Sequence, residues 1–260
     1  MNVQDAGEKI SEKYFQITRT PHTAAAKEFL GTCRSYSVKV GDAVYKYYQA
    51  GHGPVLILVH GLHSNLSSMV ALAEDLVEQH YRVVLFDAPA HGEARGSTTN
   101  PPQVRAVIRK ICGQFDDIRA VICHSLGGMW ALSAWHEGLQ VKAFISIASP
   151  ASKKFLVEKF AELNRIDHES VDALVTELEK QFGESVWVDY SPAEIAKTIG
   201  IPGLIIHGAD DDFVPPAHAR QIHANWPDAR MELIDGAGHF DIIASPTVRQ
   251  LVSGYLRDLC

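Results

Sequence analysis

VICHSLGG, residues 121–128, is the stretch that decides the fold of this chain. Its apolar start, together with residues 119–120, is typical of a buried strand, and the run MWALSAWHEG after it has helical character. Ser125 stands on the corner between them, with Gly127 close behind. We expect Gly127 to be required, because such a turn packs backbone against backbone. A serine on a tight strand-to-helix turn forms a nucleophile elbow, which exposes the hydroxyl above the sheet.

Short apolar runs alternate with longer helical patterns on both sides of this corner. Such alternation predicts an α/β fold with a mostly parallel central sheet and helices on both faces. Upstream, two alternating segments around the Gly41-Asp42 turn predict an antiparallel edge hairpin. The buried strands are expected at residues 55–60, 81–87, 119–124, 141–148, 202–208 and 229–236.

The chain length of 260 residues favours one domain. We expect residues 1–35 to be a loosely organised N-terminal extension and residues 36–150 and 198–260 to form the core. Residues 151–197 are too long for a usual crossover and carry two helical apolar stripes, so we expect a helical insertion over the sheet.

Composition excludes several classes of function. The net charge of −7 argues against a nucleic-acid partner and an anionic membrane surface. We expect no membrane insertion and no signal peptide, because no apolar run has the required length. The four cysteines have no paired spacing, which favours a reducing cytoplasm over a disulfide framework or zinc site. The sequence leaves open a homodimer.

A serine nucleophile needs a base and a group that orients the base. His239 follows the last strand in the sequence AGHF, where an imidazole could reach Ser125. The acid is expected in the turn after the strand at 202–208, where Asp210, Asp211 and Asp212 are consecutive. We place Asp211 first, and expect the other two to be solvated or to cap the next helix.

An oxyanion hole is also required, since the tetrahedral intermediate places charge on the former carbonyl oxygen. One donor would be the N–H of Leu126, directly after the serine. The other would be the N–H of Leu62, in the loop after the strand at 55–60. His60 and His63 in that loop have no matching third ligand, so we expect no metal site.

Five segments, in order, resemble the α/β-hydrolase superfamily, and the likeness extends from about residue 40 to 258. The resemblance is to serine esterase-like and lipase-like members with a helical cap. It implies a Ser125, Asp211 and His239 triad, with Leu62 and Leu126 as oxyanion donors and residues 151–197 as the cap. The segments are VHGLHSN, FDAPAHGEARG, CHSLGG, HGADDDFVP and GAGHF.

The sequence departs from the superfamily pattern at two places. Cys123 stands where many members have glycine, and residues 89–94 differ from the P-G-H-G-x-S that many members have. The serine at position 125 excludes the dehalogenase members, whose resemblance would imply an aspartate nucleophile.

These features together predict a carboxylic ester hydrolase that forms an acyl-enzyme on Ser125, with a small-molecule substrate and no cofactor. Thioesters, lysophospholipids and carbon–carbon bonds are alternative substrates for the same triad, and a non-catalytic ligand-binding protein is a third alternative. We expect the insertion to cover the serine with a modest apolar pocket for short or medium acyl groups. Its candidate substrate contacts are Phe155, Phe160 and Trp187.

Overall fold

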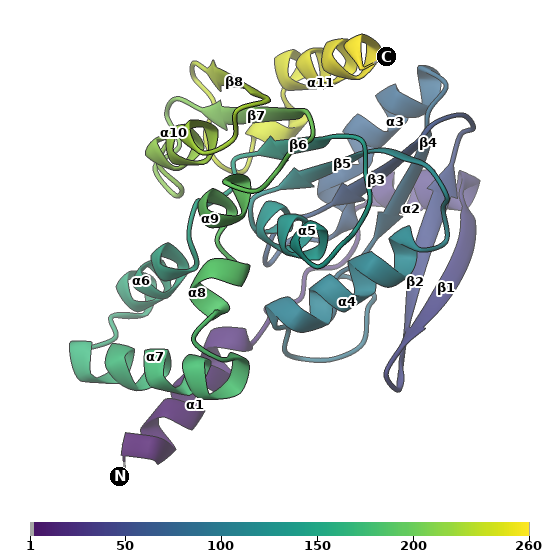
Figure 1. Cartoon of the computed structure of the whole chain (residues 1–260). Coiled ribbons are helices and arrows are strands. Elements are labelled where there is room, and N and C mark those ends of the chain that lie inside the picture. Colours follow the sequence, from purple (N-terminus) through teal and green to yellow (C-terminus); the bar gives the residue numbers. More distant parts are fainter. Residues whose placement is uncertain (1–2, 260) are drawn as a thin grey trace.

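A computed structural model describes residues 3–259 of the chain, which are built around one eight-stranded sheet (Figure 1). The strand order is β1-β2-β4-β3-β5-β6-β7-β8, and all neighbours from β4 through β8 pair in parallel. The predicted mostly parallel sheet is therefore confirmed. The strands are β1 (Arg34–Val40), β2 (Ala43–Ala50), β3 (Val55–Val59), β4 (Arg82–Phe86), β5 (Ile118–His124), β6 (Phe144–Ile147), β7 (Gly203–Gly208) and β8 (Ala229–Ile234).

The edge hairpin predicted around Gly41 is also confirmed. Strands β1 and β2 pair antiparallel, and β2 then pairs antiparallel with β4. Gly41 has a φ of 57°, a left-handed conformation that glycine adopts without steric cost.

Helices cover both faces of the sheet, as predicted. Alternate residues of each parallel strand enter opposite apolar clusters: Ile57 packs beneath α4, α5, α9 and α10, whereas Leu58 packs beneath α2, α3 and α11. The α-helices are α1 (Val3–Phe15), α2 (Ala24–Thr32), α3 (Val70–Glu78), α4 (Pro101–Cys112), α5 (Leu126–His136), α6 (Lys153–Asn164), α7 (His168–Phe182), α8 (Val186–Asp189), α9 (Pro192–Ala196), α10 (Ala217–Ala224) and α11 (Pro246–Asp258).

Among residues 3–259, no helix combines the length and the apolar character that a bilayer span requires.

In the same part of the chain, three cysteines are free thiols, while Cys260 lies outside the described residues. The free thiols are Cys33, Cys112 and Cys123.

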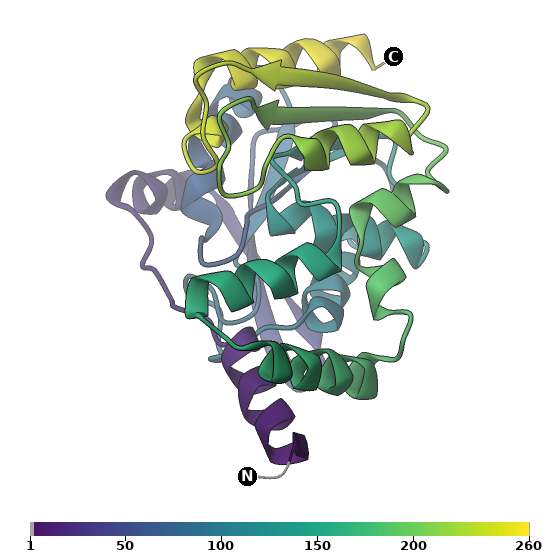
Figure 2. The same ribbon diagram turned by 90° about the vertical axis from the view of Figure 1, so that its left-hand side faces the viewer.

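The expectation of a loosely organised N-terminus is wrong for residues 3–32. Helix α2 packs Ala26 and Phe29 into the core under β3 and β4. Helix α1 lies against α7 at the end of the molecule remote from α11, side by side in both views (Figures 1 and 2). Apolar residues at helical spacing in α1, such as Ile10 and Tyr14, pack there and stabilise the helix through tertiary contact.

The insertion at residues 151–197 is helical throughout most of its length and contains α6 to α9. The apolar stripe of α7 does not pack on the top of the sheet, which was the surface we expected. Its residues Leu174 and Leu178 are instead buried against α1 and α6, including Ile10 and Val157. Part of the surface on which α7 packs therefore comes from the N-terminal helix α1. No sequence pattern indicated this contact, because α1 and α7 are far apart in the chain.

A buried ion pair ties the N-terminal segment to the core. His22 Nε2 donates to Asp87 Oδ2 at 2.7 Å, and the same carboxylate accepts the N–H groups of Leu66 and Glu93. Burial acts to raise the pKa of Asp87, but these hydrogen bonds outweigh it and hold that pKa below its usual range. Asp87 therefore stays ionised and joins three loops.

Replacement of Asp87 by alanine should lower the free energy of unfolding by about 3–5 kcal/mol, because it removes one partner of a buried pair and leaves backbone donors unsatisfied. Urea denaturation at neutral pH measures the change. Asp117→Ala is the control: it breaks the exposed pair with Lys142 and should cost less than about 1 kcal/mol. Equal losses in the two variants would contradict the structural role of Asp87.

Candidate active site

Ser125 occupies a strained corner between β5 and α5. Its φ of 53° and ψ of −125° lie in a region that non-glycine residues rarely adopt, at a typical cost of about 1–3 kcal/mol. Its N–H donates to the carbonyl of Ile147 at 2.8 Å, which holds the corner on the edge of β6. The prediction of a strand–serine–helix turn is confirmed.

Two glycines make room for this corner. A Cβ on Gly127 would lie 2.5 Å from the carbonyl oxygen of Val59, so only glycine lets α5 approach β3 so closely. A Cβ on Gly61 would lie 3.0 Å from Cβ of Ser125. The requirement for glycine at 127 is confirmed, and Gly61 has a related role that sequence reasoning did not assign.

A continuous series of hydrogen bonds joins Ser125, His239 and Asp211. The Ser125 Oγ lies 2.9 Å from His239 Nε2, and His239 Nδ1 lies 2.8 Å from Asp211 Oδ2. The three residues come from the ends of β5, β7 and β8, and all three are buried. The structure thus brings together the three residues that the sequence singled out, in the order serine, base, acid.

Asp211 is the one aspartate of its turn that points at His239. Its Oδ1 accepts the N–H groups of Phe213 and Val214, at 3.0 and 2.8 Å. Neighbouring Asp210 instead accepts the N–H of Gly236, and Asp212 is exposed. Neither neighbour caps α10.

His207 is a support that sequence reasoning missed. Its Nε2 donates to the Val214 carbonyl at 2.7 Å and lies 3.3 Å from Oδ2 of Asp211. Burial alone would raise the pKa of Asp211, but hydrogen bonds from His207, His239 and the Val214 N–H outweigh it and hold that pKa well below its usual range. Asp211 is therefore ionised at neutral pH and accepts the imidazole N–H of His239.

Another buried imidazole holds the loop that contains His239. His124 Nε2 donates to the carbonyl of His239 at 2.9 Å, from the position directly before Ser125. Burial lowers the pKa of His124 to about 4, so this ring stays neutral beside His239. The only signal in the sequence was its place beside the serine, which says nothing of a partner 115 positions away.

His60 and His91 hold the loop that contains Leu62. His60 donates to the Gly61 carbonyl and accepts the Ala88 N–H, so both of its ring nitrogens are occupied and neither is free for a metal. His91 accepts the N–H of His63 at 3.2 Å. In the described part of the chain, no three potential ligand residues are grouped to bind a metal ion.

The two residues expected to supply the oxyanion donors both belong to segments that come close to Ser125. Leu126 is the first residue of α5, so its N–H has no acceptor within the helix. The loop with Leu62 passes the serine at Gly61, as the close approach described above shows. Both leucine residues line the cavity above Ser125.

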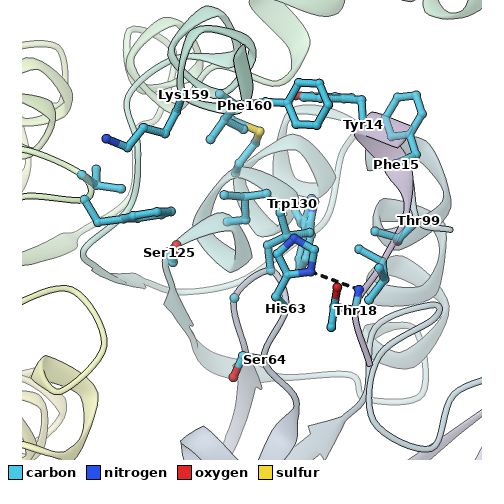
Figure 3. Close-up of a pocket in the computed structure, with 18 of the residues that line it drawn as sticks. Tyr14, Phe15, Thr18, His63, Ser64, Thr99, Ser125, Trp130, Lys159 and Phe160 are labelled. Atoms are coloured by element: carbon cyan, nitrogen blue, oxygen red, sulfur yellow. Dashed lines mark hydrogen bonds between the residues drawn. The ribbon is translucent and has the colours of Figure 1, made fainter. Parts of the chain in front are cut away.

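That cavity has a volume of about 830 Å³ and is mostly apolar. Its wall includes Ser125, His239, the end of α1 and one face of α6 (Figure 3). Phe155 and Phe160 line it, whereas Trp187 is not part of the described wall. Trp187 belongs to α8, packs against residues of α6 and α7, and donates its indole N–H to Glu179 at 2.6 Å, so its expected place in the pocket is corrected.

Comparisons with known proteins give one consistent result. A family model described as alpha/beta hydrolase family matches residues 56–249. The chain is 25% identical over 244 residues to esterase YbfF of Escherichia coli, covering 81% of this chain and 95% of the relative. It is 27% identical over 239 residues to the pimeloyl-acyl-carrier-protein methyl ester esterase of Xanthomonas campestris, covering 73% and 89%.

Solved structures agree in fold. An esterase from Pyrococcus furiosus superimposes with a TM-score of 0.74 at 18% identity, over 94% of this chain and 97% of that one. At this level of identity the likeness supports the fold alone.

Asp211→Asn should lower kcat for an aryl ester by about 10⁴-fold, because an amide favours the wrong imidazole tautomer. Asp210→Asn and Asp212→Asn are matched controls from the same turn and should retain kcat within a few-fold. Steady-state kinetics with purified variants measure the three values. A larger loss at position 210 or 212 would move the role of the acid to that residue.

Proposed function

This chain belongs to the alpha/beta hydrolase family, and on that premise we propose that it is a serine hydrolase that cleaves carboxylic esters. The main support is the buried hydrogen-bonded series Ser125–His239–Asp211 at the base of an apolar cavity. The esterase relatives support the class of reaction.

In the first half of the reaction, His239 Nε2 takes the proton of Ser125 as Oγ attacks the acyl carbonyl. The carbonyl oxygen becomes an oxyanion, and the N–H groups of Leu62 and Leu126 donate to it. Asp211 holds the imidazole in the productive tautomer and stabilises the imidazolium that forms. The tetrahedral intermediate collapses when His239 protonates the leaving alcohol, and an acyl-enzyme remains.

In the second half, a water molecule takes the place of the alcohol. His239 removes one of its protons while the oxygen attacks the acyl-enzyme carbonyl, and the same two N–H groups stabilise the new oxyanion. Collapse returns the proton to Ser125 and releases the carboxylic acid. Every proton moves between the substrate, water and residues of this chain, so none of these steps requires a metal or an organic cofactor.

Helix α6 supplies the surface that would discriminate between acyl or alcohol groups. Phe155 and Phe160 face the cavity from this helix, and the volume of about 830 Å³ is within the range of small-molecule sites. We expect short or medium acyl esters rather than long-chain triglycerides to enter it.

Ser125→Ala should lower turnover of p-nitrophenyl esters by several orders of magnitude and abolish labelling by a fluorophosphonate probe, because both reactions need the same oxygen. Circular dichroism checks that the variant is folded. Ser97→Ala, which changes an exposed serine outside the cavity wall, should label and turn over normally. Full hydrolysis by Ser125→Ala would exclude this serine as the nucleophile, and a wild-type chain that does not label would favour a non-catalytic binding protein.

Phe155→Ala and Phe160→Ala should shift the ratio of kcat/KM between longer and shorter p-nitrophenyl esters toward the longer ones, since each removes volume from the cavity wall. Trp187→Ala serves as the control, because that ring lies on the same insertion but outside the described wall. An unchanged chain-length profile in both phenylalanine variants would show that α6 does not determine acyl selectivity.

A further inference from the structure

Lys153 is a buried lysine in the wall of the active-site cavity. It is the first residue of α6, and only 2% of its surface is exposed. Its Nζ donates to the hydroxyl of Tyr14 at 2.7 Å and lies 4.6 Å from the centre of that ring. Within residues 3–259, no carboxylate forms a salt bridge with it. Lys159, another lysine of the wall, differs in this respect, because it is partly exposed and pairs with Glu162 at 3.1 Å.

The rest of the cavity wall does not compensate this charge. The described wall contains three lysines and no aspartate or glutamate. Asp211 accepts hydrogen bonds from the Val214 N–H and from His239, and it is not part of the described cavity wall. The cavity is therefore an apolar space with a positive charge in its wall.

Burial of a cation with a single neutral hydrogen-bond partner is unfavourable. The same burial lowers the pKa of Lys153 to about 7 and raises the pKa of Tyr14 above its usual range. Tyr14 thus keeps its phenolic proton and, while its oxygen accepts from Lys153, can donate that proton to a ligand. The pair presents two kinds of donor to one point of the cavity.

This donor pair lies away from the reacting serine. Figure 3 shows Tyr14 and Phe15, at the end of α1, on the opposite side of the cavity from Ser125. Since Lys153 Nζ is bonded to Tyr14, its ammonium lies on that far side as well. A ligand that reached both Ser125 and the Lys153–Tyr14 pair would have an ester group at one end and a hydrogen-bond acceptor at the other.

We propose that the substrates are esters with a carboxylate at the far end of an apolar chain, and that Lys153 and Tyr14 bind this carboxylate. The proposal rests on the proposed ester hydrolase function. A carboxylate has the single negative charge that one ammonium can neutralise, and its two oxygens can accept from the ammonium and the phenol together. The apolar wall between the two ends matches a hydrocarbon chain.

The test compares the monomethyl esters of succinate, adipate, suberate and sebacate with the methyl esters of straight-chain fatty acids of matching length. Wild-type kcat/KM should favour the charged ester by about tenfold to a hundredfold at the best length, the usual value of a charged hydrogen bond. A second series, acetate esters of ω-hydroxy acids, places the carboxylate on the alcohol side and identifies which half of the ester occupies the far end.

Lys153→Met keeps the length of the side chain and removes its charge. It should abolish the preference for the charged ester, mainly through KM. Tyr14→Phe should reduce the preference by a smaller factor. Lys154→Met is the matched control, because this neighbour on the same helix is exposed and outside the described wall, and it should behave as wild type.

Binding without catalysis separates this proposal from the proposed function. Ser125→Ala should bind suberate more tightly than octanoate in calorimetry, and the added Lys153→Met change should remove that difference. Equal wild-type kcat/KM for charged and neutral esters, or an equal loss of both in Lys153→Met, would overturn the proposal while leaving the esterase intact. Tighter binding of suberate by a chain that hydrolyses no ester would contradict the esterase and retain the anion site.

Discussion

The strained backbone of Ser125 is the constraint on which the rest of this structure depends. A serine with a φ of 53° persists only if its surroundings leave it no alternative. Its N–H is bonded to β6, α5 begins at the next residue, and the glycines at 61 and 127 let the flanking backbones approach. Strands β3, β5 and β6 are therefore all needed to hold one hydroxyl at the carboxyl ends of the central strands. The large buried core on both faces supplies the stability that offsets this local cost.

Around this corner, buried histidines hold the loops on which the site is built. His124 binds the backbone of the loop that contains His239, His207 supports the turn that contains Asp211, and His60 and His91 occupy the loop beside the serine. Burial keeps the pKa of His60, His91 and His124 below the usual value, so these rings donate with one nitrogen without adding charge near the base. In this way the site contains several imidazoles, but among the described residues only that of His239 hydrogen-bonds to the Ser125 hydroxyl.

The cover of the cavity is made of two segments that are remote in sequence. Helix α7 packs its apolar face on α1, and the aromatic side chains of α6 line the cavity. Because α1 also contributes Tyr14 to the wall, the N-terminal segment takes part in the proposed recognition of substrate as well as in folding. The buried pair of His22 and Asp87 anchors the chain just after this helix, so the stability of the core and the shape of the cavity are linked.

The sequence by itself determined the sheet, the serine corner and the candidate triad, because these are written in local patterns: apolar runs, glycine positions, and polar residues directly after strands. Those patterns led to Ser125, Asp211 and His239, which the structure brings within hydrogen-bond distance, although their catalytic role stays a prediction. Only the tertiary structure decided that residues 3–32 contain two packed helices, that Trp187 lies outside the described cavity wall, and that Lys153 contacts Tyr14. The last contact joins residues 139 positions apart. A local sequence pattern cannot show which distant side chain will contact a buried lysine, because that depends on how the whole chain folds.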